Sequence, residues 1–156
     1  MQQNQPIEII EFTNALKDAI KTLNYEWLQK YFAIEEGDER SLSNPQEEII
    51  DKGGYIYYAK LNGEIVGTAS LLKKDKDIFE VGKMAVTGSA QGHGIGNILL
   101  EHCIQIAVEI GAKKLILYSN TKLAPAIHLY TKAGFVPTDL EPGLYERADI
   151  KMEKLL

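Results

Sequence analysis

The sequence predicts a mixed α/β fold in which one sheet is flanked by helices. Three observations lead to this prediction. The 156 residues are the length of one ordinary domain, so a single domain over residues 1–156 is expected. Three strand candidates joined by tight turns occupy the middle of the chain, and a strand-helix-strand order follows them. The 45% hydrophobic and 25% charged residues are typical of a soluble globular protein.

The first third is expected to form one strand and two helices. Residues 7–12, IEIIEF, are rich in β-branched side chains and predict a short strand. After Thr13, a candidate N-cap, apolar residues recur at helical spacing as far as Leu28. Residues 33–43 have no apolar period and are expected to be a loop. Residues 44–53 begin with Asn-Pro and end in glycine, which predicts a short second helix.

The middle of the chain predicts an antiparallel meander of three strands. Residues 55–61 and 64–72 are β-rich runs on either side of Asn62-Gly63, the residue pair most typical of a two-residue hairpin turn. Residues 77–86 predict the third strand, which a short polar turn connects to the second.

The last third alternates helices and strands. Apolar residues keep helical spacing from about residue 97 to a glycine at 111, and residues 113–120 then predict a buried strand. Residues 124–134 predict a helix with proline in its first turn and glycine at its end. Short strand candidates follow at 135–137 and 144–155.

Charge and composition argue against several partners. The net charge is −5 and no stripe of Lys or Arg stands out, so nucleic acid is not expected to bind. No apolar run reaches the roughly 20 residues of a membrane-spanning helix, so no membrane partner is expected. The N-terminal residues lack a signal-peptide pattern, and the single cysteine, Cys103, excludes an internal disulfide. These observations predict a cytoplasmic protein, with Cys103 as a buried apolar residue; an oligomer is compatible with them.

The glycine-rich stretch QGHGIG at residues 91–96 directly precedes a predicted helix. Starting from Gly92 and Gly94, a dinucleotide-binding fingerprint would need glycine where Asn97 stands, and the Lys-Ser/Thr pair of a phosphate-binding P-loop is absent. Glycines still allow a ligand to approach the backbone, and the free N–H groups at a helix start favour an anion such as a pyrophosphate. The alternative is a turn that only joins a strand to a helix.

The stretch at 91–96 resembles the Gln/Arg-x-x-Gly-x-Gly/Ala signature of the GNAT family of N-acetyltransferases. The later segment AIHLYTKAGF, at 126–135, is similar to a helix of that family, and Asn120 after the preceding strand also fits. The resemblance covers residues from about 54 to 156. It implies a GNAT-type mixed, mostly antiparallel sheet of six or seven strands with helices on both faces, splayed between its fourth and fifth strands.

The same resemblance implies an acetyl-CoA-dependent N-acetyltransferase with acetyl-CoA as co-substrate and no metal. The cofactor pyrophosphate would lie on the backbone amides of the glycine stretch, and the pantetheine arm would pair with the fourth strand. The implied cofactor-binding residues are Met84, Ala85, Val86, Gln91, Gly92, His93, Gly94, Ile95, Gly96, Asn97, Asn120 and Ala126. The side chain of His93 is expected to point to solvent.

Two residues are catalytic candidates. Tyr130 occupies the family position whose phenol faces the CoA sulfur, which makes it the candidate general acid; the alternative is a tyrosine that packs between helix and sheet. Glu80 is the candidate general base, acting directly or through water. The two-residue period of a strand is expected to place Glu80 on one face with Gly82, Met84 and Val86. The alternative for Glu80 is a carboxylate at the rim that pairs with Lys83, or a strand residue that faces solvent.

The acceptor implied by the resemblance is a primary amine on a small molecule or a peptide. A non-catalytic CoA-binding sensor or partner-docking module with the same fold is the alternative function. Four carboxylates in the predicted loop, Glu35, Glu36, Asp38 and Glu39, suggest attraction of a cationic acceptor. Their alternative interpretation is a solvated loop.

Overall fold

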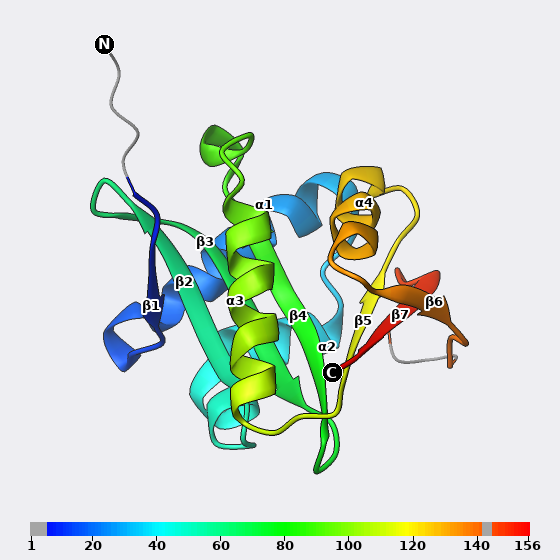
Figure 1. Cartoon of the computed structure of the whole chain (residues 1–156). Helices are drawn as coiled ribbons and strands as arrows, with labels where there is room; N and C mark the ends of the chain where they lie inside the picture. Colours follow the sequence, from blue (N-terminus) through cyan, green and yellow to red (C-terminus); the bar gives the residue numbers. More distant parts are fainter. Residues whose placement is uncertain (1–5, 142–144) are drawn as a thin grey trace.

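A computed structural model describes residues 6–141 and 145–156 and contains a seven-stranded sheet with helices on both faces (Figure 1). The strand order is β1-β2-β3-β4-β5-β7-β6, and every neighbouring pair is antiparallel except β4 and β5. This confirms the predicted fold class. The strands are β1 (Glu8–Glu11), β2 (Tyr55–Leu61), β3 (Glu64–Lys73), β4 (Ile78–Val86), β5 (Lys114–Ser119), β6 (Val136–Thr138) and β7 (Ile150–Leu155).

The helices divide between the two faces, and each face has its own core. The helices are α1 (Lys17–Tyr31), α2 (Glu36–Ser43), α3 (Ile95–Glu109) and α4 (Ala124–Lys132), with short turns η1 (Asn14–Leu16), η2 (Gln46–Ile50) and η3 (Gly88–Ala90). On one face α3 buries Leu99 and Cys103 against the strands, which forms the α3-side core. On the other face α1 and α2 bury Ile20, Leu28 and Leu42, which forms the α1-side core. Cys103 is therefore a buried apolar residue, as predicted.

Most local predictions hold in the structure. Asn62 and Gly63 form the β2–β3 turn with φ of 53° and 81°, the left-handed values that this turn needs. Helix α3 begins at Ile95, two residues before the predicted start. The strand expected over residues 144–155 is the shorter β7, and residue 144 lies outside the described residues. Among the described residues, no helix combines the length and the apolarity that crossing a bilayer requires.

The predicted loop at 33–43 is wrong, because this segment contains helix α2. The helix has one buried apolar side chain, Leu42, so its sequence shows no apolar period. Its start is fixed by polar groups instead: the Asp38 carboxylate accepts a hydrogen bond from the Glu35 backbone N–H at 3.0 Å. A helix capped in this way depends on a buried carboxylate, which a search for apolar spacing does not detect.

The expectation that Glu80, Gly82, Met84 and Val86 share a face is also wrong. A register shift between Thr68 and Ser70 leaves two residues of β4 opposite one residue of β3, and Lys83 at the bulge has φ of 52°. A bulge shifts the alternation of side chains between the two faces of the sheet by one residue. Met84 and Val86 therefore pack against the α3-side core. Glu80 remains on the α1 side of the sheet, opposite Leu72, which packs against the α1-side core.

Strands β4 and β5 diverge after a short parallel contact. They pair only over Ile78–Glu80 and Lys114–Ile116. Beyond that point β4 continues along β3, whereas β5 continues along β7, so the two strands separate in the direction of α4 (Figure 1). The predicted splay between the fourth and fifth strands is thus present, and it leaves main-chain groups of β4 without a strand partner on that side.

Candidate active site

A cavity of about 630 Å³ occupies the space between the diverging strands. The glycine turn before α3 forms one end of its wall, and Glu80 lies in the wall where β4 and β5 begin to separate. Helices α1 and α4 contribute the sides. Of the predicted cofactor-binding and catalytic residues, all line the cavity except His93, whose side chain is exposed. The fold therefore brings together residues that are up to 50 positions apart in the sequence, from Glu80 to Tyr130.

The glycine turn has a backbone that only glycine adopts readily. Gly92 and Gly94 have φ of 91° and 74°, and Gly94 is the N-cap of α3. A Cβ atom at either position would meet no other atom within 4 Å, so the turn is open to a ligand. No side chain from the described part of the chain caps α3, so its first N–H groups are available to an anion at the positive end of the helix dipole.

Helix α1 holds the segment that leads into this turn. The Glu26 carboxylate accepts hydrogen bonds from the Thr87 hydroxyl at 2.9 Å and from the Gly88 backbone N–H at 2.8 Å. At the start of the turn, the Gln91 side-chain amide donates to the Val86 carbonyl at 3.2 Å. The glycine turn is thus fixed to both α1 and the end of β4, and Glu26 is a positioning residue that sequence reasoning missed.

Tyr130 lies on α4, where its ring meets the Phe135 ring edge-on with centroids 6.2 Å apart. No hydrogen bond joins its hydroxyl to another residue in the part of the chain that the structure describes. Burial raises the pKa of Tyr130 to about 12. The phenol is therefore protonated at neutral pH, as a proton donor must be, and the residue faces the cavity while it packs at the helix-sheet seam.

Glu80 is a buried carboxylate, with an exposed fraction of 2%, rather than a group at the rim. Its Oε2 accepts a hydrogen bond from the Tyr145 hydroxyl at 3.1 Å, and its ion pair is with Lys74, at 3.4 Å, rather than with Lys83. Burial raises the pKa of Glu80, although the charges of Lys74 and Lys83 and the Tyr145 hydrogen bond oppose this shift. A carboxylate with a raised pKa is better suited to accept a proton from an ammonium group.

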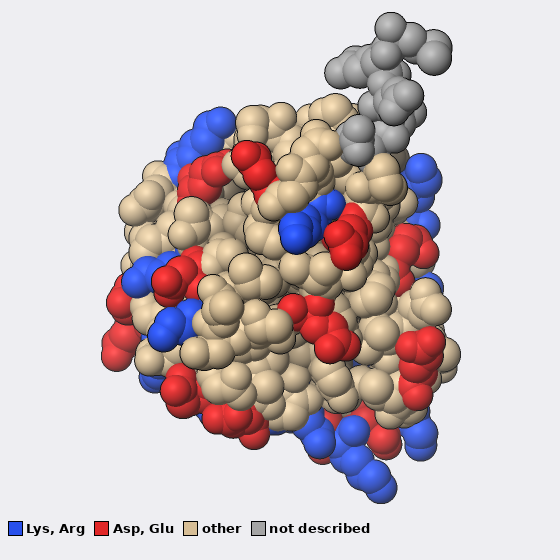
Figure 2. Space-filling model, turned by 90° about the vertical axis from the view of Figure 1, so that its left-hand side faces the viewer, with Lys and Arg blue, Asp and Glu red and all other residues tan. Residues whose placement is uncertain are grey.

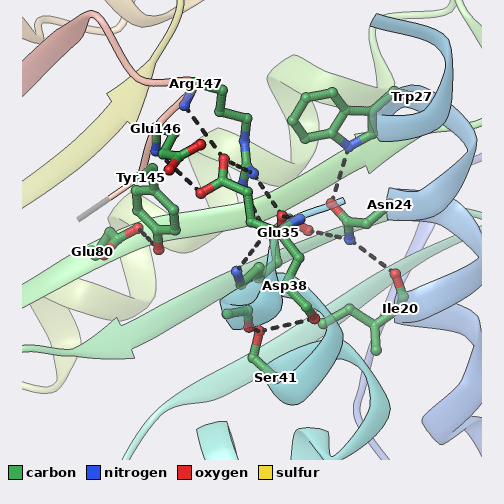
Figure 3. Close-up of polar contacts among 12 residues, drawn as sticks. Ile20, Asn24, Trp27, Glu35, Asp38, Ser41, Glu80, Tyr145, Glu146 and Arg147 are labelled. Atoms are coloured by element: carbon green, nitrogen blue, oxygen red, sulfur yellow. Dashed lines mark hydrogen bonds and ion pairs between the residues drawn. The ribbon is translucent and has the colours of Figure 1, made fainter. Parts of the chain in front are cut away.

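Beside Glu80, Arg147 ties the segment before β7 to the start of α2 (Figure 3). Its guanidinium donates to both Asp38 oxygens, at 2.6 and 2.8 Å, and to Glu35 at 3.0 Å. Burial by itself would raise the pKa of Asp38, but the hydrogen bonds from Arg147 and Glu35 and the charges of Arg147 and Lys83 lower it overall. The charges of Arg147, Asp38 and Glu35 are thus paired with one another.

This network changes the interpretation of the acidic segment. Glu35 and Asp38 are paired with Arg147, and Glu39 accepts hydrogen bonds from Tyr25 and Ser43. Of the four carboxylates expected to attract a cation, three are therefore engaged by other groups of the chain. The structure gives no support to an acidic loop that steers a cationic acceptor.

Asn120 lines the cavity but uses its side chain to hold the backbone. Its amide N–H₂ donates to the Arg147 carbonyl at 2.6 Å, and its oxygen accepts from the Lys122 N–H at 2.8 Å. The stretch from Tyr145 to Arg147 thus contacts Glu80, α2 and the residue that follows β5. The sequence contains no signal for this placement, because the stretch has no motif and its partners lie far away along the chain.

One face of the protein mixes both signs of charge. On the face shown in Figure 2, Lys and Arg side chains alternate with Asp and Glu and do not gather into one basic area. Among residues 6–141 and 145–156, no group of His, Cys, Asp and Glu side chains has a geometry that could hold a metal ion.

The amino-acid sequence is similar to those of known acetyltransferases. A sequence model described as the acetyltransferase (GNAT) family matches residues 21–135, so the match includes most of α1 and all of α2, upstream of the sequence motifs. A streptothricin acetyltransferase from Streptomyces lavendulae is 41% identical over 56 residues, which are 36% of this chain and 30% of that protein. The uncharacterized N-acetyltransferase YvbK from Bacillus subtilis is 30% identical over 97 residues, 60% of this chain and 63% of that protein. The matched segment thus spans less than two thirds of both relatives.

Solved structures share the fold over almost the whole chain. A GNAT-family acetyltransferase from Staphylococcus aureus superimposes with a TM-score of 0.86 at 23% identity, covering 96% of this chain and 99% of that one. A GNAT-family acetyltransferase from Elizabethkingia anophelis with acetyl-CoA bound gives a TM-score of 0.73 at 24% identity, covering 96% and 98% of the two chains.

Proposed function

The chain belongs to the acetyltransferase (GNAT) family, and from this premise we propose that it transfers the acetyl group of acetyl-CoA to a primary amine. The observation that carries this proposal is the cavity between β4 and β5, which joins an anion-binding helix start to a buried carboxylate. A solved structure of the same fold with acetyl-CoA bound supports the choice of co-substrate.

The glycine turn would bind the pyrophosphate of acetyl-CoA through the backbone N–H groups from Gln91 to Gly96. The pantetheine arm would run along the unpaired side of β4 and form strand-like hydrogen bonds with the main chain of Met84 and Val86. Asn97, Asn120 and Ala126 would flank it. Glu80, Met84 and Val86 all line this cavity, which supports the arrangement, because one strand would then contribute both the cofactor contacts and the base.

The transfer requires a neutral amine, so Glu80 would accept the ammonium proton, directly or through water. The amine nitrogen then forms a bond to the thioester carbonyl carbon, and the carbon-sulfur bond breaks with its electron pair on sulfur. The backbone N–H of Met84 or Ala85 would stabilise the negative charge that develops on the carbonyl oxygen. Tyr130 would donate a proton to the thiolate, which yields CoA. The acetylated nitrogen still carries an extra proton and would lose it to solvent, from which Tyr130 would regain its own proton.

The test is to follow free thiol release from acetyl-CoA with a panel of amines. We expect release with at least one amine, and a loss of about 10²- to 10⁴-fold in turnover for Glu80→Gln, the range typical of removing a general base. Glu64→Gln, at an exposed position of β3, is the matched control and should keep the activity. Acetyl-CoA binding without thiol release from any amine would instead indicate the non-catalytic CoA-binding module.

A further inference from the structure

Glu80 has one oxygen whose hydrogen-bonding capacity is unused. Its Oε2 accepts from Tyr145, but its buried Oε1 accepts no hydrogen bond from any residue that the structure describes. The Lys74 ammonium lies 3.4 Å from Oε1 as an ion pair without hydrogen-bond geometry. A buried carboxylate oxygen without a hydrogen-bond donor is costly, so the Glu80 carboxylate retains capacity to accept a further hydrogen bond.

Lys83, on the same strand, has hydrogen-bond donors without acceptors. Its side chain is 9% exposed and its ammonium carries three N–H donors. The nearest carboxylate oxygen, Asp38 Oδ1, is 3.6 Å away, which is beyond hydrogen-bond distance. Asp38 accepts its hydrogen bonds from other groups, two from Arg147 and one from Glu35. Within the described residues, no hydrogen bond therefore starts from the Lys83 ammonium.

These two groups face the same space. Glu80 and Lys83 both line the cavity, and both lie on the α1 side of the sheet, where the bulge directs Lys83 toward Asp38 of α2. They are close enough that each charge affects the ionisation of the other. The cavity wall thus carries two groups with unused hydrogen-bonding capacity. The Glu80 carboxylate is an acceptor and the Lys83 ammonium is a donor, and the two residues lie three positions apart on β4.

We propose that the amine acceptor is a zwitterion of the amino-acid type, whose amine donates to Glu80 while an oxyanion a few atoms away binds Lys83. This inference rests on the proposed acetyl transfer and names its substrate class. A carboxylate or similar acid group would give the Lys83 ammonium the acceptor that Asp38 does not provide. An amine without an acid group would offer the Lys83 ammonium no such acceptor, and Lys83 would keep only its ion pair with Asp38 and its contact with the Tyr145 ring. A lysine side chain within a protein lacks the nearby oxyanion and would be a poor acceptor.

The experiment compares matched acceptors that differ only in the acid group: an amino acid, its carboxamide, and the corresponding decarboxylated amine. Thiol release from acetyl-CoA gives kcat/KM for each. We expect the acid to exceed the amide by about 10- to 100-fold, the effect of one charge-assisted hydrogen bond. Equal values for acid and amide across the panel would overturn the inference.

Variants then assign the preference to one residue. Lys83→Met should reduce the acid-to-amide ratio to near 1, whereas Lys83→Arg, which keeps the charge, should retain much of it. Lys74→Met is the matched control, because it removes another cation beside Glu80 that does not line the cavity. The ratio is taken within one variant, so a changed pKa of Glu80 cancels. A preference that survives in folded Lys83→Met would contradict the assignment.

Failure of this inference is distinguishable from failure of the proposed function. If no amine releases thiol, acetyl transfer itself is wrong. Calorimetric titration of the CoA-loaded protein with the same acid and amide still tests the oxyanion site: binding of the acid alone, lost in Lys83→Met, supports it. Equal binding of both, or binding of neither, refutes it.

Discussion

The ionisation of a single residue, Glu80, sets the pH dependence expected of the site. Burial raises its pKa, and the hydrogen bond from Tyr145 is one of the contacts that moderate this rise. A base works only when deprotonated, so activity should increase as the pH rises through the pKa of Glu80.

Tyr145→Phe should move the acidic limb of the kcat/KM profile to higher pH, because it removes a hydrogen bond that favours the charged carboxylate. Tyr118→Phe is the control: its ring packs against Tyr145 with centroids 5.6 Å apart, but its hydroxyl bonds to Glu141. Rate profiles of both variants against pH provide the measurement. An acidic limb at the same pH in Tyr145→Phe and wild type would show that Glu80 is not the titrating base.

Tyr130→Phe tests the proposed acid. The phenol makes no hydrogen bond within the described residues, so its removal should leave folding and acetyl-CoA affinity nearly unchanged. Turnover should fall by about 10²-fold, as is typical for loss of a proton donor. Steady-state rates and calorimetric titration with acetyl-CoA measure the two quantities. Unchanged turnover would indicate that the thiolate leaves without Tyr130.

At the scale of elements, helix α3 has two glycines of similar conformation at its two ends. Gly94 precedes its first turn with φ of 74°, and Gly111 follows its last turn with φ of 84°. Neither would bring an added Cβ within 4 Å of another atom. Gly94 borders the cavity and Gly111 does not, so only Gly94 would lie beside acetyl-CoA in the proposed function.

Gly94→Val and Gly111→Val should therefore cost similar stability, at least about 1–2 kcal/mol each, since valine is strained at positive φ. Only Gly94→Val should weaken acetyl-CoA binding, by about 10-fold or more, because its side chain would stand where the pyrophosphate approaches. Thermal unfolding and calorimetric titration separate the two effects. If both folded variants bind acetyl-CoA like wild type, the glycine turn is not the pyrophosphate site.

For the whole molecule, the bond between Asp38 and Arg147 joins segments 109 positions apart. Asp38 is 1% exposed, and its pKa is lowered in the folded state. A carboxyl with a lowered folded pKa adds stability above its unfolded pKa of about 3.9, and this stability is lost as the pH falls through the folded value. Part of the acid unfolding should therefore come from this one group.

Asp38→Asn should reduce the free energy of unfolding at neutral pH by about 3 kcal/mol, because it leaves Arg147 without its main partner. It should also flatten the loss of stability below about pH 4, since the titrating group is gone. Denaturant unfolding at several pH values measures both. Asp18→Asn, at an exposed position of α1, serves as the control. An unaltered pH dependence in Asp38→Asn would mean that other carboxyls govern acid unfolding.

Local signals in the sequence determined most elements and the position of the glycine turn before α3. Helical spacing, the Asn62-Gly63 turn and the glycines at 92 and 94 act over a few residues, so they can be interpreted without a structure. Helix α2 is the exception, because its stability depends on Asp38, whose main partner lies far away in the sequence.

Only the tertiary structure decided which side chains meet in the cavity. The bulge at Lys83 depends on how β3 and β4 pair, and it reverses the facing of every later residue of β4. The contacts of Glu80 with Tyr145 and of Asp38 with Arg147 span 65 and 109 positions. Such contacts follow from the packing of the whole sheet and its helices, and no spacing within the sequence encodes them.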